Sequence, residues 1–476
     1  MNNTFLEKVE LSRVSTTQSI AAEKKKLSEQ YFTPAKVSSI MAEMFSPRPG
    51  QTLKVLDPCC GVGNLSAAVM AYAEQHDENP YLTMIEKDSF LTKIARDNFR
   101  NTQNTTIIEA DFFGRVKNLK KFDRIILNPP YSKIPSESDL AVFCKDFLGY
   151  KEGNIYSAFV SCCLKLLSAS GELVAIIPRS FCNGPSFKRF RKCILEDFHV
   201  RAIHLFESRK IFWESNVLQE VVILKIAKQG NGVVRISHEQ INGAVSVREI
   251  QNNKVFFQGD LQKFIHIPMA IDDDKLLEKM SRFTQTILTI GLRASTGKVV
   301  DFRCVDWLTS KKYKNTSYLL YQDNITSGSV IFGSVPAAKM RYIKSHEKSL
   351  AVLVPRDNYV LVRRISFKES PTRIVAAPLL KHEYNETYIG IENHLNYIWG
   401  EESELTRNIC VALFAYLSTK TIDAYIRRFS GHTQINATDL NSIPVPTLDE
   451  LERFGNNHYN ISMSELIVSA ELTFFQ

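Results

Sequence analysis

The sequence predicts an α/β protein: a doubly wound, mostly parallel sheet of seven strands with an antiparallel edge strand, followed by a mixed α+β domain. The first observation is a regular alternation, from about residue 54, of short β-branched runs and helix-length amphipathic segments. The second is a glycine-containing turn directly after the first of these runs, where parallel sheets bind ligands. The third is length, because 476 residues exceed what one hydrophobic core usually organises.

Each element follows from its apolar pattern and its flanking turn residues. Strands are predicted at Lys54–Leu56, Tyr81–Ile85, Thr105–Ile108, Asp123–Leu127, Glu172–Ile177, Arg201–Phe206 and, as the antiparallel edge, Val217–Ile226. The small and apolar residues between the strands suit helices packed on a sheet. These helices are predicted at Asn64–Ala73, Ser89–Asn98 and Ile155–Leu167.

Three regions are predicted along the chain. Residues 1–30 are polar and form a lead-in, helical or loose, that is too short for a domain. Residues 31–230 hold the sheet, and the turn residues Gln229–Gly232 end its alternation. Residues 231–476 form the second domain, which mixes short strand-like runs with one helix at Glu404–Arg427.

Composition and charge exclude several classes of protein. With 44% hydrophobic and 23% charged residues the chain is neither disordered nor fibrous, and no apolar run approaches the roughly 18 to 20 residues of a membrane span. The start of the chain lacks the apolar stretch of a signal peptide. Nine scattered cysteines without a C-x-x-C pair predict reduced thiols and no metal site. We therefore expect a cytoplasmic protein without membrane association, whose net charge of +8 is compatible with a polyanionic partner.

The turn at Asp57–Asn64 indicates a cofactor site. Its glycines let the backbone approach a ligand, but the third position of the dinucleotide pattern G-x-G-x-x-G is Ser66. Asp57 would also repel a pyrophosphate, whereas it would attract a cationic ligand without phosphates. S-adenosylmethionine is such a ligand, and the turn therefore predicts a site for it.

Acidic residues at the ends of the next two strands extend this site. Glu86 ends the second strand, where a carboxylate can accept both ribose hydroxyls of the cofactor. Asp111 ends the third strand and offers an acceptor for the adenine amino group, and Phe112 offers a ring against the adenine face. Each acid alone is most simply a solvated loop residue, but three acids at successive strand ends favour one shared site.

The tetrapeptide Asn128-Pro129-Pro130-Tyr131 follows the fourth strand and indicates chemistry on an amino group. Its prolines fix the backbone and leave only acceptors. The Asn128 side chain and the Pro129 carbonyl can then hold the two hydrogens of an exocyclic amino group and aim its lone pair at a methyl donor. Tyr131 supplies a face for stacking a planar substrate, and Phe187 can close the other side.

These segments resemble the amino-methylating DNA methyltransferases, and within them the gamma-ordered N6-adenine class of type II restriction-modification systems. The similarity extends to Tyr31–Pro34, Ile177–Gly184, Val217–Glu220, Ser295–Arg303 and Gly431–Leu440. Cys59-Cys60 stands where this class commonly has Ala-Cys, a small change that leaves the turn intact.

The resemblance implies a methyltransferase fold, S-adenosylmethionine as cofactor, and methyl transfer to N6 of an adenine flipped out of double-stranded DNA. It implies cofactor binding at Tyr31, Thr33, Asp57, Pro58, Cys59, Gly61, Gly63, Glu86, Asp111, Phe112 and Asn128. It implies catalysis at Asn128, Pro129, Pro130 and Tyr131, with the base stacked between Tyr131 and Phe187. The region 231–476 becomes the target recognition domain. The expected partners are duplex DNA and a cognate restriction endonuclease on a separate chain, with the enzyme acting as a monomer.

Basic and amide side chains are the candidates for contact with DNA. Beside Phe187 these are Lys188, Arg189 and Arg191, although a basic cluster is more often a solvated face than a phosphate contact. In the second domain the polar residues expected nearest DNA are Asp301, Arg303, His432, Gln434 and Asn436. His432 can equally be a structural histidine whose hydrogen bonds are satisfied within the fold.

Three alternatives stay open. An Asn-Pro-Pro-Tyr string also occurs in enzymes that methylate a glutamine amide in a protein, and it does not exclude an RNA adenine as substrate. A DNA-specificity subunit can keep the fold without turnover, although the intact Asp57, Asn128 and Tyr131 favour an active enzyme.

Overall fold

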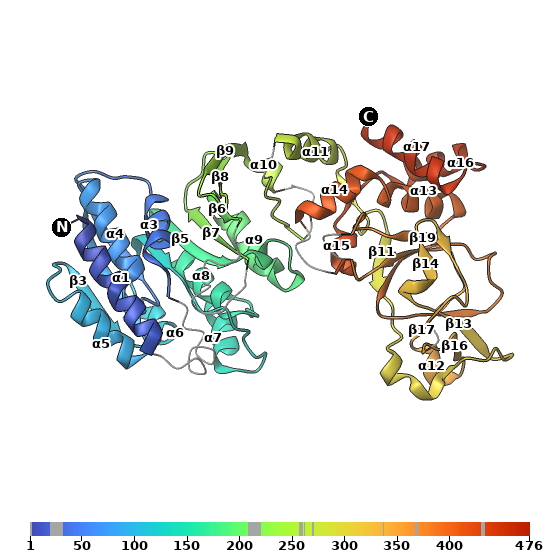
Figure 1. The fold of residues 1–476 in the computed structure, drawn as a ribbon, viewed down its shortest axis with the longest axis horizontal. Coiled ribbons are helices and arrows are strands. Elements are labelled where there is room, and N and C mark those ends of the chain that lie inside the picture. Colours follow the sequence, from blue (N-terminus) through green and yellow to red (C-terminus); the bar gives the residue numbers. More distant parts are fainter. Residues whose placement is uncertain are drawn as a thin grey trace. The chain divides into compact units, whose positions relative to one another are not determined.

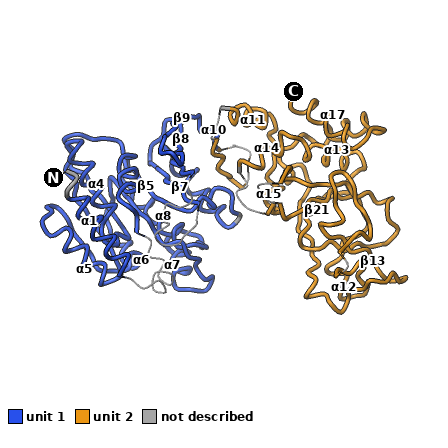
Figure 2. Tube along the Cα trace, in the orientation of Figure 1, with its two compact units in different colours: residues 1–255 blue, residues 256–476 orange. Residues whose placement is uncertain are grey.

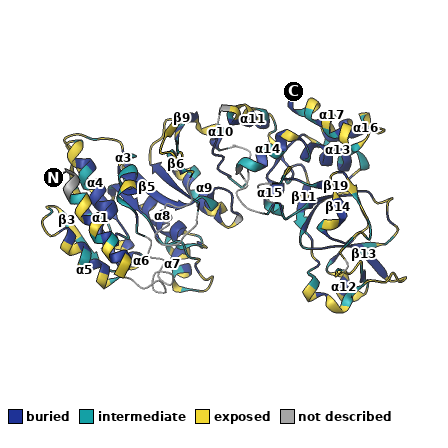
Figure 3. Cartoon of the chain, in the orientation of Figure 1, coloured by how far each residue is buried: buried dark blue, intermediate teal, exposed yellow. Residues whose placement is uncertain are grey.

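The computed structural model describes residues 2–19, 32–207, 220–256, 260, 262–268, 271–336, 338–366, 370–429 and 434–476 (Figure 1). The chain divides into two compact units, residues 1–255 and 256–476 (Figure 2). Within each unit the strands are mostly buried and the exposed residues lie on loops and outer helix faces (Figure 3).

A large mixed sheet forms the centre of unit 1 and, over the described residues, contains nine strands in the order β3-β2-β1-β4-β5-β7-β6-β8-β9. The strands β1 to β5 pair in parallel, and β7 is antiparallel to both β5 and β6. The first six predicted strands are confirmed as β1 to β6. The bounds are β1 (Thr52–Asp57), β2 (Asn79–Glu86), β3 (Thr105–Glu109), β4 (Phe122–Leu127), β5 (Leu167–Pro178), β6 (His199–Phe206), β7 (Val221–Ala227), β8 (Val233–Glu239) and β9 (Val245–Gln251).

The sheet differs from the predicted one in the strands beyond β5. β7 is antiparallel, as expected for Val217–Ile226, but it lies inside the sheet between β5 and β6. All seven of its residues are buried, a pattern typical of an interior strand. β8 and β9 extend the sheet beyond β6, and β9 is the antiparallel edge strand.

The added strands also move the boundary between the units. The turn at Gln229–Gly232, interpreted above as the end of the sheet domain, connects β7 to β8, which pairs in parallel with β6. A short helix, α10 (Asn252–Val255), follows β9, and unit 1 ends there at residue 255 rather than at 230. Turn residues mark a chain reversal, but they do not tell whether the next strand joins the same sheet.

Four helices, α1, α3, α4 and α5, share one hydrophobic core with residues of β1, β2, β4, β5 and β7 (Figure 1). The predicted lead-in therefore contains a helix, α1, whose Val9 is fully buried in this core. The three predicted helices are confirmed as α4, α5 and α8. The bounds are α1 (Asn2–Ser19), α3 (Ala35–Glu43), α4 (Asn64–Gln75), α5 (Ser89–Asn98), α6 (Phe112–Arg115), α7 (Asp139–Leu148), α8 (Ile155–Lys165) and α9 (Lys188–Asp197).

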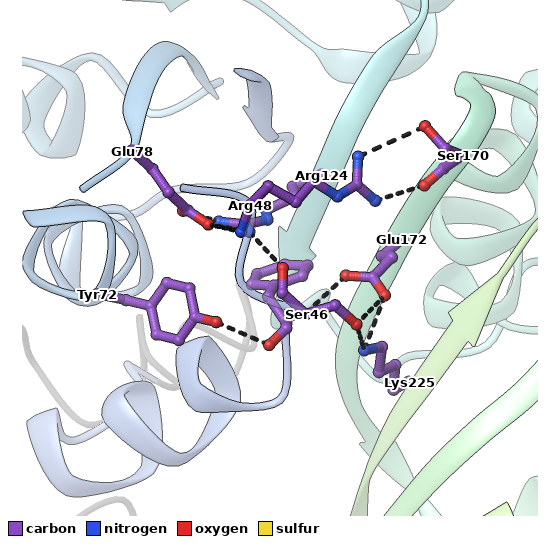
Figure 4. Close-up of polar contacts among 9 residues, drawn as sticks. Ser46, Arg48, Tyr72, Glu78, Arg124, Ser170, Glu172 and Lys225 are labelled. Carbon is purple, nitrogen blue, oxygen red and sulfur yellow. Dashed lines mark hydrogen bonds and ion pairs between the residues drawn. The ribbon is translucent and has the colours of Figure 1, made fainter. Parts of the chain in front are cut away.

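A buried polar cluster fixes the segment between α3 and β1 (Figure 4). The Arg124 guanidinium donates to the Glu78 carboxylate and to the Ser46 carbonyl, each over 2.7 Å. Ser46 also donates its amide and hydroxyl to Glu172, which pairs with Lys225 at 2.8 Å. Because each buried charge has a partner of opposite sign, removing one member would leave another uncompensated. The cluster holds the end of α3 against the sheet.

Unit 2 contains, in its described residues, a four-stranded antiparallel sheet and a five-stranded mixed sheet. Except for the short α12, its helices share one core with residues of the first of these sheets. The first sheet consists of β11 (Leu292–Thr296), β21 (Leu395–Gly400), β18 (Tyr359–Arg363) and β19 (Ala376–Leu379), and the second of β12 (Leu308–Thr309), β16 (Tyr342–Lys344), β13 (Thr316–Leu320), β20 (Tyr388–Ile391) and β17 (Leu353–Pro355). Two short pairs are β10 (Gln285–Thr286) with β22 (Pro444–Val445) and β14 (Ile325–Thr326) with β15 (Ser329–Val330). The helices are α11 (Ile271–Ser281), α12 (Glu347–Leu350), α13 (Arg407–Leu417), α14 (Lys420–Phe429), α15 (Ala437–Asn441), α16 (Leu448–Asn457) and α17 (Met463–Phe475).

The helix predicted at Glu404–Arg427 is two helices, α13 and α14, bent by 60°. At the bend the Thr419 hydroxyl donates to the Tyr416 carbonyl, a local bond that competes with continuation of the helix. Among the described residues no single helix is long and apolar enough to cross a membrane. The bent pair α13 and α14 has the required length and apolarity only when the two helices are counted together.

Candidate active site

A cavity of about 510 Å³ opens where several strands of the unit 1 sheet end, a size typical of small-molecule sites. The carboxyl ends of parallel strands meet at one edge, so the turns after β1, β2, β3 and β4 all contribute to its wall. The predicted site residues on this wall are Pro58, Cys59, Gly61, Glu86, Asp111, Phe112, Asn128, Pro129 and Pro130.

The two glycines of the turn after β1 have different roles. Both have a positive φ, +55° at Gly61 and +101° at Gly63, which favours glycine. Gly61 lines the cavity, and its amide donates to Glu86 Oε2 over 2.9 Å. Gly63 precedes α4 and is not among the described lining residues; a Cβ atom there would overlap the Phe99 ring. Gly63 therefore permits helix packing, and its direct contact with the cofactor stays a prediction.

Asp57 ends β1 and is fully buried behind the cavity wall. The Ser66 hydroxyl donates to its Oδ2 over 2.8 Å, whereas its Oδ1 has no hydrogen-bond partner among the described residues. Burial raises the pKa of this carboxyl to about 7, although the Ser66 hydrogen bond opposes the shift. A buried acceptor without a donor beside the glycine turn fits the cationic end of S-adenosylmethionine.

Glu86 ends β2 on the cavity wall. Its two carboxylate oxygens accept from the amides of Gly61 and Asp88, each over 2.9 Å. Burial raises the pKa of Glu86, and these amides oppose the shift. Each oxygen keeps further acceptor capacity, which suits a ligand with neighbouring hydroxyls.

Asp111 and Phe112 lie where β3 gives way to α6. Asp111 caps this helix, because its Oδ1 accepts from the amides of Phe113 (2.8 Å) and Gly114 (3.3 Å). The buried Phe112 ring stacks on Phe159 of α8, with 5.1 Å between ring centroids. Both predicted residues face the cavity, and the cap fixes their orientation.

Asn128 is held at both ends of its side-chain amide. Its Nδ2 donates to Thr33 Oγ1 and its Oδ1 accepts from the Tyr131 hydroxyl, each over 3.0 Å. Thr33 comes just before α3 and is buried. The structure thus brings together the predicted N-terminal segment and the tetrapeptide after β4, which are 95 residues apart in sequence.

Tyr131 and Phe187 are not among the described residues that line the cavity. Both rings instead contact the buried Tyr156 of α8, with centroid distances of 6.1 Å to Tyr131 and 5.4 Å to Phe187. Stacking of a base between Tyr131 and Phe187 stays a prediction.

Cys59 lines the cavity and approaches the Asn128 carbonyl, with its Sγ at 3.5 Å. Burial, and then the charge of Asp57, raise the pKa of its thiol well above the usual range. The raised pKa disfavours the nucleophilic thiolate, so we assign Cys59 to the wall rather than to covalent chemistry.

The basic residues after Phe187 divide into two kinds. Lys188 and Arg189 are exposed at the start of α9 and are free to meet phosphates. Arg191 is fully buried and donates to the carbonyls of Phe181 (2.8 Å) and Gly184 (2.7 Å). The prediction that Arg191 contacts DNA was wrong, because its guanidinium holds the turn that carries Phe187.

Two of the DNA-contact candidates in unit 2 have local structural partners. A third, Asp301, has a buried Oδ1 without a hydrogen-bond partner among the described residues. Gln434 forms a β-bridge with Ile365, and the Asn436 amide donates to Asp439 at the start of α15.

Of the three remaining predicted site residues, the structure describes only Arg303. Arg303 is exposed, with its guanidinium carbon 5.5 Å from the Phe302 ring centroid. Tyr31 and His432 lie outside the described residues.

Sequence reasoning missed much of the aromatic wall. Besides Phe112, the cavity is lined by Phe32, Phe113, Phe143 and Phe159. The sequence offered an indication for Phe32 and Phe113 alone, because each is next to a predicted site residue. In the part of the chain that the structure describes, no group of three or more His, Cys, Asp or Glu side chains is placed to hold a metal ion.

These features define a class of protein. A mostly parallel sheet carries one cavity, lined by a glycine turn after β1, by Glu86 and Asp111 at the ends of β2 and β3, and by Asn128, Pro129 and Pro130 after β4. With Asp57 buried behind this wall, the arrangement is that of methyltransferases that use S-adenosylmethionine. The chain belongs to the N-6 DNA methylase family, whose model matches residues 16–286.

Two relatives match most of the chain. It is 35% identical over 474 residues to the type II methyltransferase M.BsuBI of Bacillus subtilis, covering 95% of this chain and 93% of the relative. It is 33% identical over 451 residues to the type II methyltransferase M.PstI of Providencia stuartii, covering 90% and 88%. The predicted family is confirmed: the chain is a DNA methyltransferase whose cofactor is S-adenosylmethionine.

Proposed function

We propose that the enzyme transfers a methyl group from S-adenosylmethionine to N6 of an adenine flipped out of double-stranded DNA, as the site-specific modification enzyme of a restriction-modification system. The observation that carries this proposal is that Asn128, Pro129 and Pro130 line the same cavity as Glu86 and Asp111. The relatives M.BsuBI and M.PstI are type II methyltransferases, which favours DNA over RNA or a protein glutamine as substrate.

The cofactor supplies a methyl group activated on a sulfonium, and the cavity supplies the groups that orient it. Glu86 has acceptor capacity for the ribose hydroxyls, and the Phe112 ring provides a face for the adenine. Asp111 uses Oδ1 to cap α6, so its Oδ2 is the oxygen that accepts from the adenine amino group. The buried Asp57 carboxylate attracts the cationic methionine end.

Asn128 and Pro129 hold the amino group of the target base. An amide oxygen has two lone pairs, so Asn128 Oδ1 can accept a substrate hydrogen beside the Tyr131 hydroxyl. The hydrogen bond from Asn128 Nδ2 to Thr33 fixes the amide so that Oδ1, not Nδ2, faces Tyr131. Two acceptors favour a more tetrahedral nitrogen, with its lone pair directed at the methyl group that the bound cofactor would supply. The methylated nitrogen would then release one of its hydrogens as a proton to water. Direct attack by the amino nitrogen needs no covalent enzyme intermediate, and the raised pKa of the Cys59 thiol disfavours the thiolate that such an intermediate would require.

Contacts with DNA are proposed in both units. On α9 the exposed Lys188 and Arg189 are candidates for phosphate contacts next to Phe187. In unit 2 the exposed Arg303 lies over Phe302, which is 76% exposed, and a cation beside an exposed ring suits nucleic acid. We propose residues 256–476 as the recognition domain, a cognate nuclease on a separate chain, action as a monomer, and the cytoplasm as the location.

The proposal is tested by sequencing DNA from a host free of adenine methylation that expresses the chain, with detection of modified bases. The expected result is N6-methyladenine at one short sequence throughout the genome, and none in a matched host that expresses Asn128→Ala. Modified cytosine, or modification of RNA with unmodified DNA, would contradict the assigned substrate.

A further inference from the structure

We propose that helix α1 is part of the cofactor site and that Glu10 is a positioning residue for cofactor binding. This inference rests on the proposed function, because it concerns the cavity assigned to S-adenosylmethionine. The N-6 DNA methylase model begins its match at residue 16, so most of α1, which spans Asn2–Ser19, lies outside the matched family region. Figure 1 shows α1 alongside α4 and α5, whose first residues follow the turns of the site.

Glu10 connects two segments of the cavity wall. Its Oε2 accepts from the amide of Ala35, the first residue of α3, over 3.1 Å, and from the side chain of Asn64, the first residue of α4, over 2.7 Å. The buried Arg13 holds the carboxylate in place, with Nε 2.9 Å from Oε2 and Nη2 2.8 Å from Oε1. One carboxylate therefore fixes the start of α3 to the start of α4.

A second bridge runs from α1 to the glycine turn itself. The Asn98 side-chain amide donates to the Val62 carbonyl over 2.9 Å and to Ser12 Oγ of α1 over 3.3 Å. Phe5 of α1 contacts the edge of Phe99, with 5.2 Å between ring centroids, and Phe99 is the ring that leaves no room for a side chain at Gly63. Three side chains of α1 thus support the turn between β1 and α4.

Both segments that Glu10 connects carry groups of the site. Phe32, which lines the cavity, and Thr33, which holds Asn128, come directly before α3. Gly61, whose amide donates to Glu86, lies three residues before the start of α4. Loss of the Glu10 carboxylate frees these two walls to shift relative to each other. Ligand affinity depends steeply on such placement, because a wall that must be ordered on binding lowers it.

The expected effect is on binding more than on chemistry. Glu10 is not among the described residues that line the cavity, and its contacts run to backbone and side chains behind the wall. Glu10→Ala should raise the Kd for S-adenosylmethionine at least tenfold, and the KM in parallel. The single-turnover rate at saturating cofactor and DNA should stay within about threefold of wild type, because saturating cofactor orders both walls again, and with them Thr33 beside Asn128.

The test uses the full chain and isothermal titration with S-adenosylmethionine alone. Two control variants are Glu7→Ala, an exposed acid of the same helix, and Tyr72→Phe, which removes a buried hydrogen bond to the Phe45 carbonyl in the same core. Both should bind like wild type. Glu10→Gln keeps an acceptor but brings an amide NH2 toward donors, so its Kd should lie between those of wild type and Glu10→Ala. If Glu10→Ala does not fold, Glu10→Gln and Ser12→Ala carry the test.

The outcomes separate this inference from the proposed function. A wild-type protein that does not bind S-adenosylmethionine would overturn the assignment of the cavity. Tight binding by wild type and equally tight binding by Glu10→Ala would overturn only the role of Glu10. A rise in Kd of the same size in Tyr72→Phe would show that any loss of core stability weakens binding, which also contradicts a specific role for α1.

Discussion

Binding of S-adenosylmethionine should weaken as the pH falls below 7, because Asp57 must be ionised to attract the cationic end of the cofactor. The carboxyl group is fully buried at the end of β1, and burial raises its pKa to about 7. A cation beside the carboxylate lowers this pKa again in the complex, so the cofactor binds preferentially to the deprotonated form. Affinity is therefore close to its maximum at about pH 8, falls to about half of that near pH 7, and falls further as Asp57 takes up a proton at lower pH.

The size of the effect follows from the pKa of about 7 in the free protein. At pH 6 roughly one Asp57 side chain in eleven is ionised, so the Kd should rise by on the order of tenfold between pH 8 and pH 6, about 1.4 kcal/mol. Asp57→Asn is the matched control, because it keeps the shape of the side chain and an acceptor for Ser66 but does not titrate. Its Kd should exceed that of wild type at pH 8, and the ratio of the two should shrink towards pH 6.

The assay is isothermal titration of both proteins at pH 8, 7 and 6. The amino group of the cofactor titrates equally in both experiments, so the ratio of the two Kd values isolates Asp57. The stability of the protein without cofactor has the opposite pH dependence. Because the pKa is raised in the folded state, the free energy of unfolding decreases as the pH rises through about 7 and the buried carboxyl loses its proton. Asp57→Asn should thus have the higher free energy of unfolding at pH 8. Kd curves of the two proteins that run parallel from pH 8 to pH 6 would refute this role of Asp57.

Three further substitutions test other parts of the site. Gly63→Ala should lower the free energy of unfolding by more than about 1 kcal/mol in denaturant titrations, because φ is +101° and the new Cβ meets Phe99; wild-type stability would contradict this packing. Arg191→Met should cost on the order of 2 kcal/mol of stability, since two buried carbonyls lose their donor, yet leave the salt dependence of DNA binding unchanged; a smaller salt slope would restore Arg191 as a phosphate contact. Tyr131→Ala should raise the activation free energy of methyl transfer by roughly 1 to 3 kcal/mol, as expected for loss of one base–aromatic stack, and Tyr131→Phe should raise it by less. Equal increases in the two variants would show that Tyr131 acts through its hydroxyl.

Much of the catalytic sheet is predictable because its signals are local. The strands up to β6 and the helices α4, α5 and α8 follow from apolar period and turn residues, and strand ends in a parallel sheet meet at one edge. Glu86 and Asp111 could therefore be assigned to one cavity from their positions after successive strands.

Other features depend on contacts that the sequence does not display. Arg191 sits in a basic run, which indicates an exposed face, but it shares the buried face of α9 with Phe190 and Ile194. A helical period through this run gives that signal, although it does not reveal which carbonyls the guanidinium satisfies.

The role of α1 was missed for a similar reason. The partners of Glu10 are Ala35 and Asn64, 25 and 54 residues away, and no periodic pattern links them. The place of β7 inside the sheet was indicated by its apolar run, which only Lys225 interrupts. The addition of β8 and β9 was not indicated, because β8 is only partly buried and β9 is largely exposed.

The most direct test of the central claim is transfer of labelled methyl groups to duplex DNA, followed by nucleoside analysis, for wild type and Asn128→Ala. Asn128 lines the cavity beside Pro129, and its amide is oriented by Thr33 and Tyr131. Wild type should place the label in N6-methyladenine. Asn128→Ala should lose most turnover while its Kd for S-adenosylmethionine stays close to that of wild type, because the lost hydrogen bond acts in the transition state. Label in a methylated cytosine, or full activity of Asn128→Ala, would contradict the assignment of this tetrapeptide.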